Sequence, residues 1–526
     1  MRRRILLQAA PAMLAAPRLA SAQTSARTLR FVPQGNLANI DPIWTTTVIA
    51  RNHALMVYDT LFGLGHDYQP RPQMAAGHEV SSDGLTHTIT LRPDLRFHDG
   101  EPVRAQDCIA SVARWSKRDV LGQRLNALLE EMRATADNKF DIVLKKPWPG
   151  LAWALGKPSA NLCAIMPERV AKTDPFQQIT EYVGSGPFRF RASQWVPGSL
   201  AAYERSAHYV PRDEPADFLA GGKQVHFDRV EWRIMPDAAT AAAALQNNEV
   251  DWWETPLADL LPLLRKNRDI AVEVVNSAGA LGMLRFNHLH PPFDRPEIRR
   301  AVFPAIDQKS FMQAALGEDA ALWQVPAGAF TPGTPLANEA GLEALTGPRD
   351  LDAAKRALRA AGYDGRKVVL LVPSDFPTLN AMAEVAADTL KRIGFNVDAQ
   401  VMDWGTLVQR RAKKEPPEQG GWNIFVTTWE GLDVSVPGSH QPLRGNGTEG
   451  WFGWASSPRR EALREAWFEA PDQAAEKRIA EQMQALVWEE APFVPLGLLR
   501  PPMAYRRSLT GIVTGGPAVF WSVRRG

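Results

Sequence analysis

The stretch from Ala75 to Asp107 restricts the possible folds of this chain more than any other. Ser82-Asp83-Gly84 is a turn signal. Residues 85–91 alternate threonine with larger side chains, as a half-buried strand does. An Asp-Gly turn then leads into a helix that we expect to begin near Ala105, with Asp107 placed to accept hydrogen bonds from the first-turn amides. The stretch therefore predicts a β-hairpin that feeds a helix.

The order of residues in this stretch closely resembles the signature of the family 5 extracellular solute-binding proteins, the peptide, dipeptide and nickel receptors of ABC importers. The matching residues are Ala76, Ser82, Asp83, Gly84, Leu91, Arg92, Phe97, His98, Asp99, Gly100, Pro102, Ala105 and Asp107. Arg104 stands where the family has a capping threonine, which predicts a weaker helix start and the same fold. His98 belongs to the F-H-D-G turn, and we expect its role to be structural.

Two later stretches support the same resemblance. Residues 183–190 are similar to the family's Gly-rich crossover, and residues 284–307 repeat its pattern of Asn, Pro-Phe, Arg-x-Ala and Ile-Asp. The resemblance covers residues 28–525, and the motifs follow the family's order along the chain. It implies an α/β, two-lobed periplasmic binding protein of type II, in the large-lobe subclass with an extra small domain. The ligand would lie in the interlobe cleft, and closure would shield it from water.

The resemblance also implies a domain division. The expected parts are a signal peptide (1–22), domain I or large lobe (28–60, 184–282 and 493–526), domain II inserted on it (61–183), and domain III or second lobe (283–492). Two crossing strands would join the lobes as a hinge. In this division the strand that begins at Phe493 returns to the first lobe.

The N-terminus has the pattern of a secretory signal. A basic head, Met1 to Arg4, precedes an apolar run and the small residues Ala20-Ser21-Ala22, which predicts cleavage after Ala22. The run is too short for a membrane span. Arg2 to Leu6 fits a twin-arginine signal loosely, so both the Sec and the Tat route stay open. No cysteine is near the cut, which argues against a lipid anchor and for a freely diffusing periplasmic protein.

Length and charge bound the class of protein. A chain of 526 residues predicts two or three domains. The formal charge of +2 includes four arginines of residues 1–22, a segment with no acid, so the mature chain carries −2. This charge implies no nucleic-acid partner. Cys108 and Cys163 could form one disulfide or remain two buried thiols.

Sequence motifs for catalysis and metal binding are weak. Residues 445–450 spell G-x-G-x-x-G, but they lead into Trp451-Phe452 rather than into a helix that could hold a pyrophosphate. His288 and His290 could bind a metal from one face of a strand, but two prolines follow directly. We therefore expect no cofactor, no metal and no enzyme. A secreted enzyme is the alternative of another class, and turnover of a bound solute would support it.

The most informative region for the ligand runs from Trp422 to Trp454. Peptide-binding relatives carry W-x-x-D-Y-x-D-P here, and the acid after the Trp pairs with the peptide α-amino group. Leu432 occupies that position in this chain. A desolvated ammonium needs a charged partner, so Glu430 or Asp433 could substitute. Otherwise both are surface acids of a loop.

The sequence thus gives a set of candidate ligand-binding residues: Trp429, Glu430, Asp433, Trp451, Asn36, Trp44 and His440. His440 is included in case the cargo is a metal chelate. Of the region's tryptophans, together with Trp404, we expect two or three to line the cleft.

These observations predict a monomeric periplasmic receptor. It would capture a small peptide or peptide-like solute and deliver it to an inner-membrane ABC permease. A non-peptide cargo, such as a nickel chelate, an opine or an oligosaccharide, is the alternative.

Overall fold

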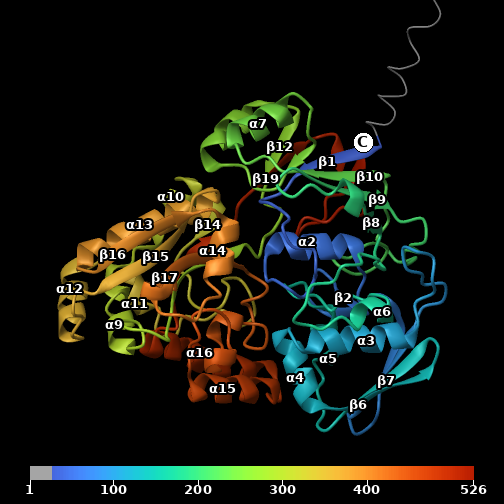
Figure 1. Cartoon of the computed structure of the whole chain (residues 1–526), viewed down its shortest axis with the longest axis horizontal. Coiled ribbons are helices and arrows are strands. Elements are labelled where there is room, and N and C mark those ends of the chain that lie inside the picture. Colours follow the sequence, from blue (N-terminus) through green and yellow to red (C-terminus); the bar gives the residue numbers. More distant parts are fainter. Residues whose placement is uncertain (1–26) are drawn as a thin grey trace, which may run out of the picture.

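The computed structural model describes residues 27–526, so the signal peptide predicted over residues 1–22 lies outside the described part. The described chain forms two lobes that lie side by side in Figure 1. The first lobe is built on a seven-stranded sheet in the order β12-β19-β11-β1-β10-β9-β8. Its strands are β1 (Thr28–Val32), β8 (Phe188–Phe190), β9 (Leu200–Arg205), β10 (Arg229–Arg233), β11 (Trp252–Trp253), β12 (Ile270–Glu273) and β19 (Met503–Arg506).

The core of the first lobe is aromatic. Phe31 of β1 is fully buried, and its ring centroid lies 5.8 Å from Trp232, 5.4 Å from Trp252 and 4.9 Å from Phe520. Rings at these distances favour tilted and edge-to-face packing, which adds to the free energy of burial. Trp232 and Trp252 therefore serve the fold. Helix α2 (Val48–Val57) lies beside this core, while α7 (Ala238–Gln246) and α8 (Leu261–Lys266) pack at its far end (Figure 1).

A four-stranded antiparallel sheet, in the order β4-β5-β7-β6, lies within residues 61–183, which we call the insert. Its elements are β4 (Ala75–Val80), β5 (Thr86–Leu91), α3 (Ala105–Ser116), α4 (Val120–Leu128), β6 (Leu129–Ala136), β7 (Lys139–Leu144), α5 (Leu151–Gly156) and α6 (Glu168–Ala171), with a short ribbon of β2 (Phe62–Leu64) and β3 (Pro70–Pro72) beside it. The Asp107 carboxylate accepts a hydrogen bond from the Arg104 amide at 2.8 Å. Cys108 and Cys163 are buried free thiols, which resolves the alternative left open by the sequence.

The F-H-D-G turn and the Gly-rich crossover hold each other in place. His98 Nδ1 accepts a hydrogen bond from the Gly184 amide at 3.2 Å, so its Nε2 carries the proton and donates to the Gly186 carbonyl at 2.9 Å. A Cβ on Gly184 would lie 1.9 Å from the Val57 carbonyl oxygen. Only glycine allows this close approach, and the structural role predicted for His98 is confirmed.

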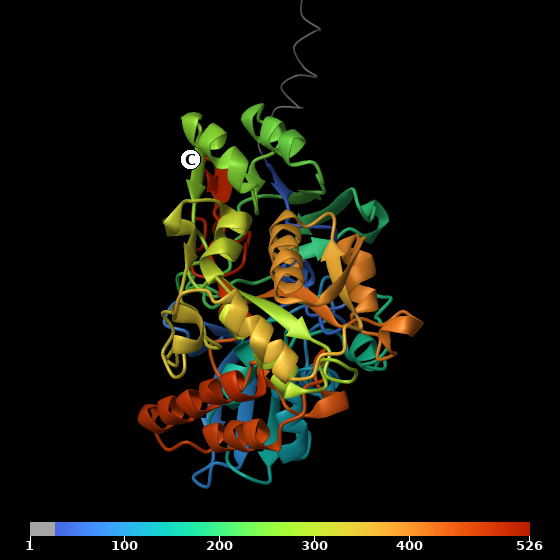
Figure 2. The same ribbon diagram turned by 90° about the vertical axis from the view of Figure 1, so that its left-hand side faces the viewer.

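The second lobe is built on a six-stranded sheet in the order β14-β18-β13-β17-β15-β16. Its strands are β13 (Ala280–Phe286), β14 (Trp323–Gln324), β15 (Lys367–Pro373), β16 (Asn396–Met402), β17 (Ile424–Glu430) and β18 (Phe493–Leu499). Its helices are α9 (Pro296–Arg300), α10 (Gln308–Leu316), α11 (Glu343–Thr346), α12 (Leu351–Ala360), α13 (Pro377–Ile393), α14 (Trp404–Arg410), α15 (Pro458–Phe468) and α16 (Gln473–Glu490). Figure 2 shows this lobe in front, with α15 and α16 at its lower end.

The chain passes between the lobes twice, through residues 274–279 and through residues 500–502. The predicted return to the first lobe at Phe493 is wrong, because β18 pairs with β13 inside the second sheet. All seven residues of β18 are buried, as in a strand covered on both faces, which suits the middle of a sheet. Over residues 27–526, no helix combines the length and the apolar character that a membrane crossing requires.

Candidate functional site

Two adjoining hollows lie between the lobes. The hinge-side hollow, about 270 Å³, reaches from the start of α2 to α14 and the end of β17. The rim-side hollow, about 660 Å³, continues past α14 toward α4. They share Asn39, Thr45, Thr46, Val408, Gln409, Arg411 and Trp451. Because both lobes supply the walls, we treat the two hollows as one interlobe cleft.

Most of the residues predicted from the sequence meet in this cleft. The hinge-side hollow is lined by Asn36, Trp429, Glu430, Asp433 and Trp451, and the rim-side hollow by Trp44 and Trp451.

The tryptophans divide as the sequence predicted. Trp404, Trp429 and Trp451 line the hinge-side hollow. Trp422 and Trp454 are buried in the core of the second lobe.

His440 is not part of the cleft. It is fully buried, its Nε2 donates to the Ala329 carbonyl at 2.9 Å, and its Nδ1 accepts from the Leu443 amide at 3.2 Å. Desolvation lowers the pKa of His440 to about 3, so the ring is neutral at physiological pH. Both nitrogens are used by the fold, and the prediction of a ligand-binding role for His440 is wrong.

Glu430 connects the second lobe to the hinge and to the first lobe. Its Oε2 accepts a hydrogen bond from Asn276 Nδ2 at 2.8 Å and lies 3.7 Å from the buried guanidinium of Arg51 in α2. Glu254 is a second buried acid that interacts with Arg51 and Glu430, and its carboxylate accepts hydrogen bonds from the Gln34 amide at 2.8 Å and from Asn52 Nδ2 at 2.9 Å. Burial raises the pKa of Glu254 to about 7. Sequence reasoning missed Glu254, which follows β11 with no motif to mark it.

Asp433 is the second acid of the cleft. Its side chain is nearly fully buried, and burial raises its pKa to about 7, although Arg51 and Lys157 act in the opposite direction. Its Oδ1 has no hydrogen-bond partner among residues 27–526. Leu432, at the position of the acid in peptide-binding relatives, packs against the core of the first lobe. Asp433 therefore offers the cleft an unused acceptor.

Arg411 was also missed by sequence reasoning. It follows the last residue of α14 and lines both hollows. Its guanidinium carbon lies 5.4 Å from the ring centroid of Trp404, 5.8 Å from that of Trp451 and 5.0 Å from that of Phe452. The cleft thus has acids near the hinge and a cation among aromatic rings.

The lobes also touch at the rim. Arg124 of α4 pairs with Glu465 of α15, and its guanidinium carbon lies 3.7 Å from the ring centroid of Phe468. Arg464 Nη2 donates to the Val120 carbonyl at 3.3 Å. We call Arg124, Arg464, Glu465 and Phe468 the rim latch.

Arg124→Ala should favour the open form, because a partly exposed pair and one cation–π contact stabilise closure by about 1 kcal/mol. Small-angle scattering should give a larger radius of gyration without ligand, and the apparent Kd should rise about five-fold. Arg133→Ala is the control, since Arg133 pairs with Glu131 and Asp141 inside the insert. An unchanged radius and Kd in Arg124→Ala would contradict a role for the rim latch.

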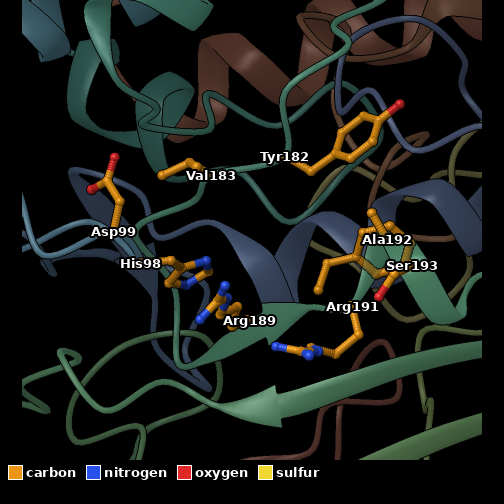
Figure 3. A pocket seen from close by; sticks show the side chains of 9 residues that line it. His98, Asp99, Tyr182, Val183, Arg189, Arg191, Ala192 and Ser193 are labelled. Carbon is orange, nitrogen blue, oxygen red and sulfur yellow. The ribbon is translucent and has the colours of Figure 1, made fainter.

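A separate hollow of about 330 Å³ lies on the first lobe, between the F-H-D-G turn and β8 (Figure 3). Figure 3 shows His98 and Asp99 on one side of it and Arg191 and Ser193 on the other. Asp99 is paired with Arg169 at 2.7 Å, and no residue predicted to bind ligand lines this hollow. In the described chain, no group of three or more His, Cys, Asp or Glu is placed to hold a metal ion.

Two lobes, two connections and a lined interlobe cleft define a two-lobed binding protein. The family model of the bacterial extracellular solute-binding proteins, family 5 (middle region) matches residues 69–450. The chain belongs to this family, as the sequence motifs predicted, and the family is one of solute-binding proteins rather than enzymes.

Three relatives illustrate the likeness. A probable peptide ABC transporter periplasmic-binding protein of Sinorhizobium fredii, y4tO, is 36% identical over 522 residues, which are 98% of this chain and 97% of the relative. The binding protein AgaA of A. tumefaciens R10, solved with agropinic acid, has a TM-score of 0.80 at 21% identity and covers 95% of this chain and 99% of its own. A dipeptide-binding protein from Pseudoalteromonas sp. SM9913, solved with Met-Leu, has a TM-score of 0.79 at 20% identity, with 95% and 100% covered. These structures confirm the two-lobed α/β fold.

Proposed function

We propose that this chain is the periplasmic receptor of an ABC importer, and that it captures a small peptide or peptide-like solute by closure of its lobes. Residues 1–22 direct export, the mature chain acts as a monomer, and an inner-membrane permease receives the cargo. No bond of the cargo is made or broken. The proposed ligand-binding residues are Trp429, Glu430, Asp433, Trp451, Asn36 and Trp44.

One observation carries the proposal: the interlobe cleft combines an aromatic lining with a pair of acids, Glu430 and Asp433, at its hinge end. A peptide offers an ammonium group, apolar side chains and amides. Aromatic walls can take the apolar side chains, and a buried acid can stabilise an ammonium that has left water. The relationship to y4tO, whose name states a peptide transporter, supports the same cargo.

An opine or related amino-acid derivative is the second candidate. The relatives' acid is replaced by Leu432, which packs against the first lobe and leaves no carboxylate at that point. A solute whose nitrogen is substituted or less exposed would tolerate this exchange. The similarity in fold to AgaA, solved with agropinic acid, is consistent with such a cargo.

Native mass spectrometry of the protein purified from its own periplasm should reveal a bound solute of low mass. A thermal-shift series of di- to hexapeptides, an opine and a nickel–histidine chelate would then identify its class. Saturating peptide should raise Tm by several degrees and reduce the radius of gyration, because binding to the folded state alone stabilises it. Stabilisation by the opine or chelate with none by peptides would contradict the preferred cargo. A radius unchanged by every stabilising solute would contradict capture by closure.

A further inference from the structure

The rim-side hollow has an unusual lining of side-chain amides. The fold uses one of them, Asn161, whose Nδ2 donates to the Ile43 carbonyl at 2.9 Å. Six others make no side-chain hydrogen bond within residues 27–526: Asn39, Gln123, Gln178, Gln409, Gln441 and Asn446. These six amides are therefore available to a cargo.

Both lobes contribute equally to this set. The first lobe with its insert supplies Asn39, Gln123 and Gln178, and the second lobe supplies Gln409, Gln441 and Asn446. Closure of the lobes therefore places amide groups on opposite sides of one space of about 660 Å³. A cargo that satisfies them must offer hydrogen-bonding groups on more than one of its faces.

Two of the six amides are already removed from water. The Oδ1 atoms of Asn39 and Asn446 are buried and have no hydrogen-bond partner in the described chain. A buried carbonyl oxygen without a donor is unfavourable. An anionic group supplies no donor, so a carboxylate or phosphate would leave both oxygens unsatisfied.

Charge does not explain this lining. Glu449 is the only acid among the described residues that line the hollow, and Arg444 is paired with Glu461 at 3.0 Å. A primary amide both donates and accepts without carrying charge, and a hydroxyl group does the same. A peptide offers one N–H and one C=O per residue, whereas a sugar carries a hydroxyl on nearly every carbon. A dense set of amides therefore suits a polyhydroxylated group better than a peptide backbone.

Aromatic rings complete the lining. Trp44 of the first lobe and Trp451 of the second both line the rim-side hollow. The guanidinium carbon of Arg118 lies 5.4 Å from the ring centroid of Trp44, and Arg118 Nη2 donates to the Trp44 carbonyl at 3.2 Å, which holds this ring in place. The C–H face of a sugar can pack against such a ring while the hydroxyls at its edge meet the amides.

We propose that the rim-side hollow is a subsite for a polyhydroxylated part of the cargo, either a sugar ring or an open hexitol chain. This assignment rests on the proposed function, because it takes the interlobe cleft as the place of the cargo. It narrows the substrate class to an amino acid or short peptide joined to such a group. The amino end would lie near Glu430 and Asp433, and the hydroxylated end would continue into the adjoining rim-side hollow.

Saturation-transfer NMR on the full exported protein tests the subsite with three probes: glucose for the ring, sorbitol for the open chain, and hexanediol, which lacks the inner hydroxyls. Glucose or sorbitol should give a signal in the wild type, and hexanediol none. Whichever of the two gives the stronger signal identifies the ring or the chain.

The double variant Gln123→Leu with Gln409→Leu should weaken polyol binding about ten-fold, as the loss of one or two hydrogen bonds predicts. Both residues are exposed on helices α4 and α14, where leucine suits the helix. Gln400→Leu is the matched control and should bind as the wild type does. Gln400 donates to Asp398 Oδ2 at 2.9 Å within β16 and lines neither hollow.

Three results would overturn the proposal: no signal from either polyol, an equal signal from hexanediol, or an undiminished polyol signal in the double variant. Tm without ligand provides a second measurement. The double variant should unfold at the same temperature as Gln400→Leu, because none of the replaced amides of the hollow is bonded to the protein. A clearly lower Tm in the double variant would indicate a structural role for these amides and overturn the assignment.

Titration calorimetry with peptides separates this inference from the proposed function. The ligands are the dipeptide Leu-Ser, the same dipeptide with glucose on the serine hydroxyl, and that glycopeptide with its sugar hydroxyls methylated. The sugar should lower the Kd about ten-fold, and methylation should remove this gain. In the double variant, the Kd values of glycopeptide and dipeptide should approach each other.

Equal Kd values for the dipeptide and the glycopeptide in the wild type would refute the subsite and leave the receptor role intact. If neither ligand binds, the proposed peptide cargo fails, and the polyol signals still decide the role of the rim-side hollow.

Discussion

Replacing Asp41 by alanine should lower the free energy of unfolding by about 3–5 kcal/mol, because it leaves a buried guanidinium without its carboxylate. Asp41 is 1% exposed and accepts from Arg114 Nη1 at 3.1 Å and Nη2 at 2.8 Å. It also accepts from the backbone amides of Ile43 and Ile179 at 3.1 Å and 2.9 Å. One carboxylate thus joins the segment after β1, helix α3 of the insert and the chain leaving the insert.

Urea unfolding followed by circular dichroism measures this effect, with the denaturant slope compared to establish that both variants unfold as the wild type does. Glu131→Ala is the control, since Glu131 forms an exposed pair with Arg133 at 3.2 Å and should change stability by less than about 1 kcal/mol. A loss for Asp41→Ala as small as that of the control would mean that Arg114 finds sufficient acceptors in the Thr173 and Gln177 carbonyls.

Glu254 and Asp433 should make a contribution to stability without ligand that falls as the pH rises from about 4 to 8. The pKa values of Glu254 and Asp433 are raised from 4.5 and 3.8 to about 7. Between its unfolded and folded pKa, each carboxyl keeps a proton in the folded state that the unfolded chain has released. The folded state therefore binds more protons, and the free energy of unfolding decreases with increasing pH. At 1.36 kcal/mol per pKa unit, each group contributes a decrease of about 3–4 kcal/mol.

Urea unfolding of the wild type and of variants at pH 5 and pH 8 isolates this decrease. The buried His53, His98 and His440, whose lowered pKa values make stability rise with pH below about 6.5, are the same in every variant. Glu254→Gln and Asp433→Asn should each remove about half of it, because a neutral amide resembles the protonated acid at both pH values. The same change in the free energy of unfolding between pH 5 and pH 8 in the double variant and in the wild type would contradict this contribution.

The binding of a cationic ligand should have the opposite pH dependence and become stronger as the pH rises. An ammonium group beside Asp433 favours the ionised carboxylate, so binding should release a proton near pH 7 and weaken as the pH falls below it.

The fold could be predicted from the sequence because its signals are local. Turn residues and strand alternation specify β5, and Asp107 specifies the start of α3, each within a few positions. The motif residues indicate which family arrangement these elements adopt. The position of β18 could not be predicted in the same way. Its apolar residues suit the interior of either sheet, and only pairing with β13, some two hundred residues earlier, selects the second one.

Only the part of the cleft that comes from one continuous segment could be predicted. Trp429, Glu430 and Asp433 lie at the end of one strand, so a single segment brings them to the interlobe face. His440 is only seven positions beyond Asp433, but the chain turns inward between them and its ring enters the core. Arg411 and Glu254 could not be recognised as residues of the site, because the property that marks each depends on its neighbours in the fold. Arg411 is surrounded by aromatic rings and has no acid beside it, and Glu254 is buried without a strong contact to a cation.

The two passages between the lobes leave from paired strands and arrive at paired strands. On one side β12 lies antiparallel to β19, and on the other β13 lies antiparallel to β18. The two connecting segments, residues 274–279 and 500–502, are therefore held together at both ends by strand pairing. They act as one two-stranded connection rather than as two independent linkers. Such a connection bends more easily than its two segments slide past each other, because sliding would strain the hydrogen bonds of both strand pairs at once. The lobes should therefore move relative to each other mainly by one hinge-bending motion. A transporter that binds either lobe can then drive the opening of the whole molecule.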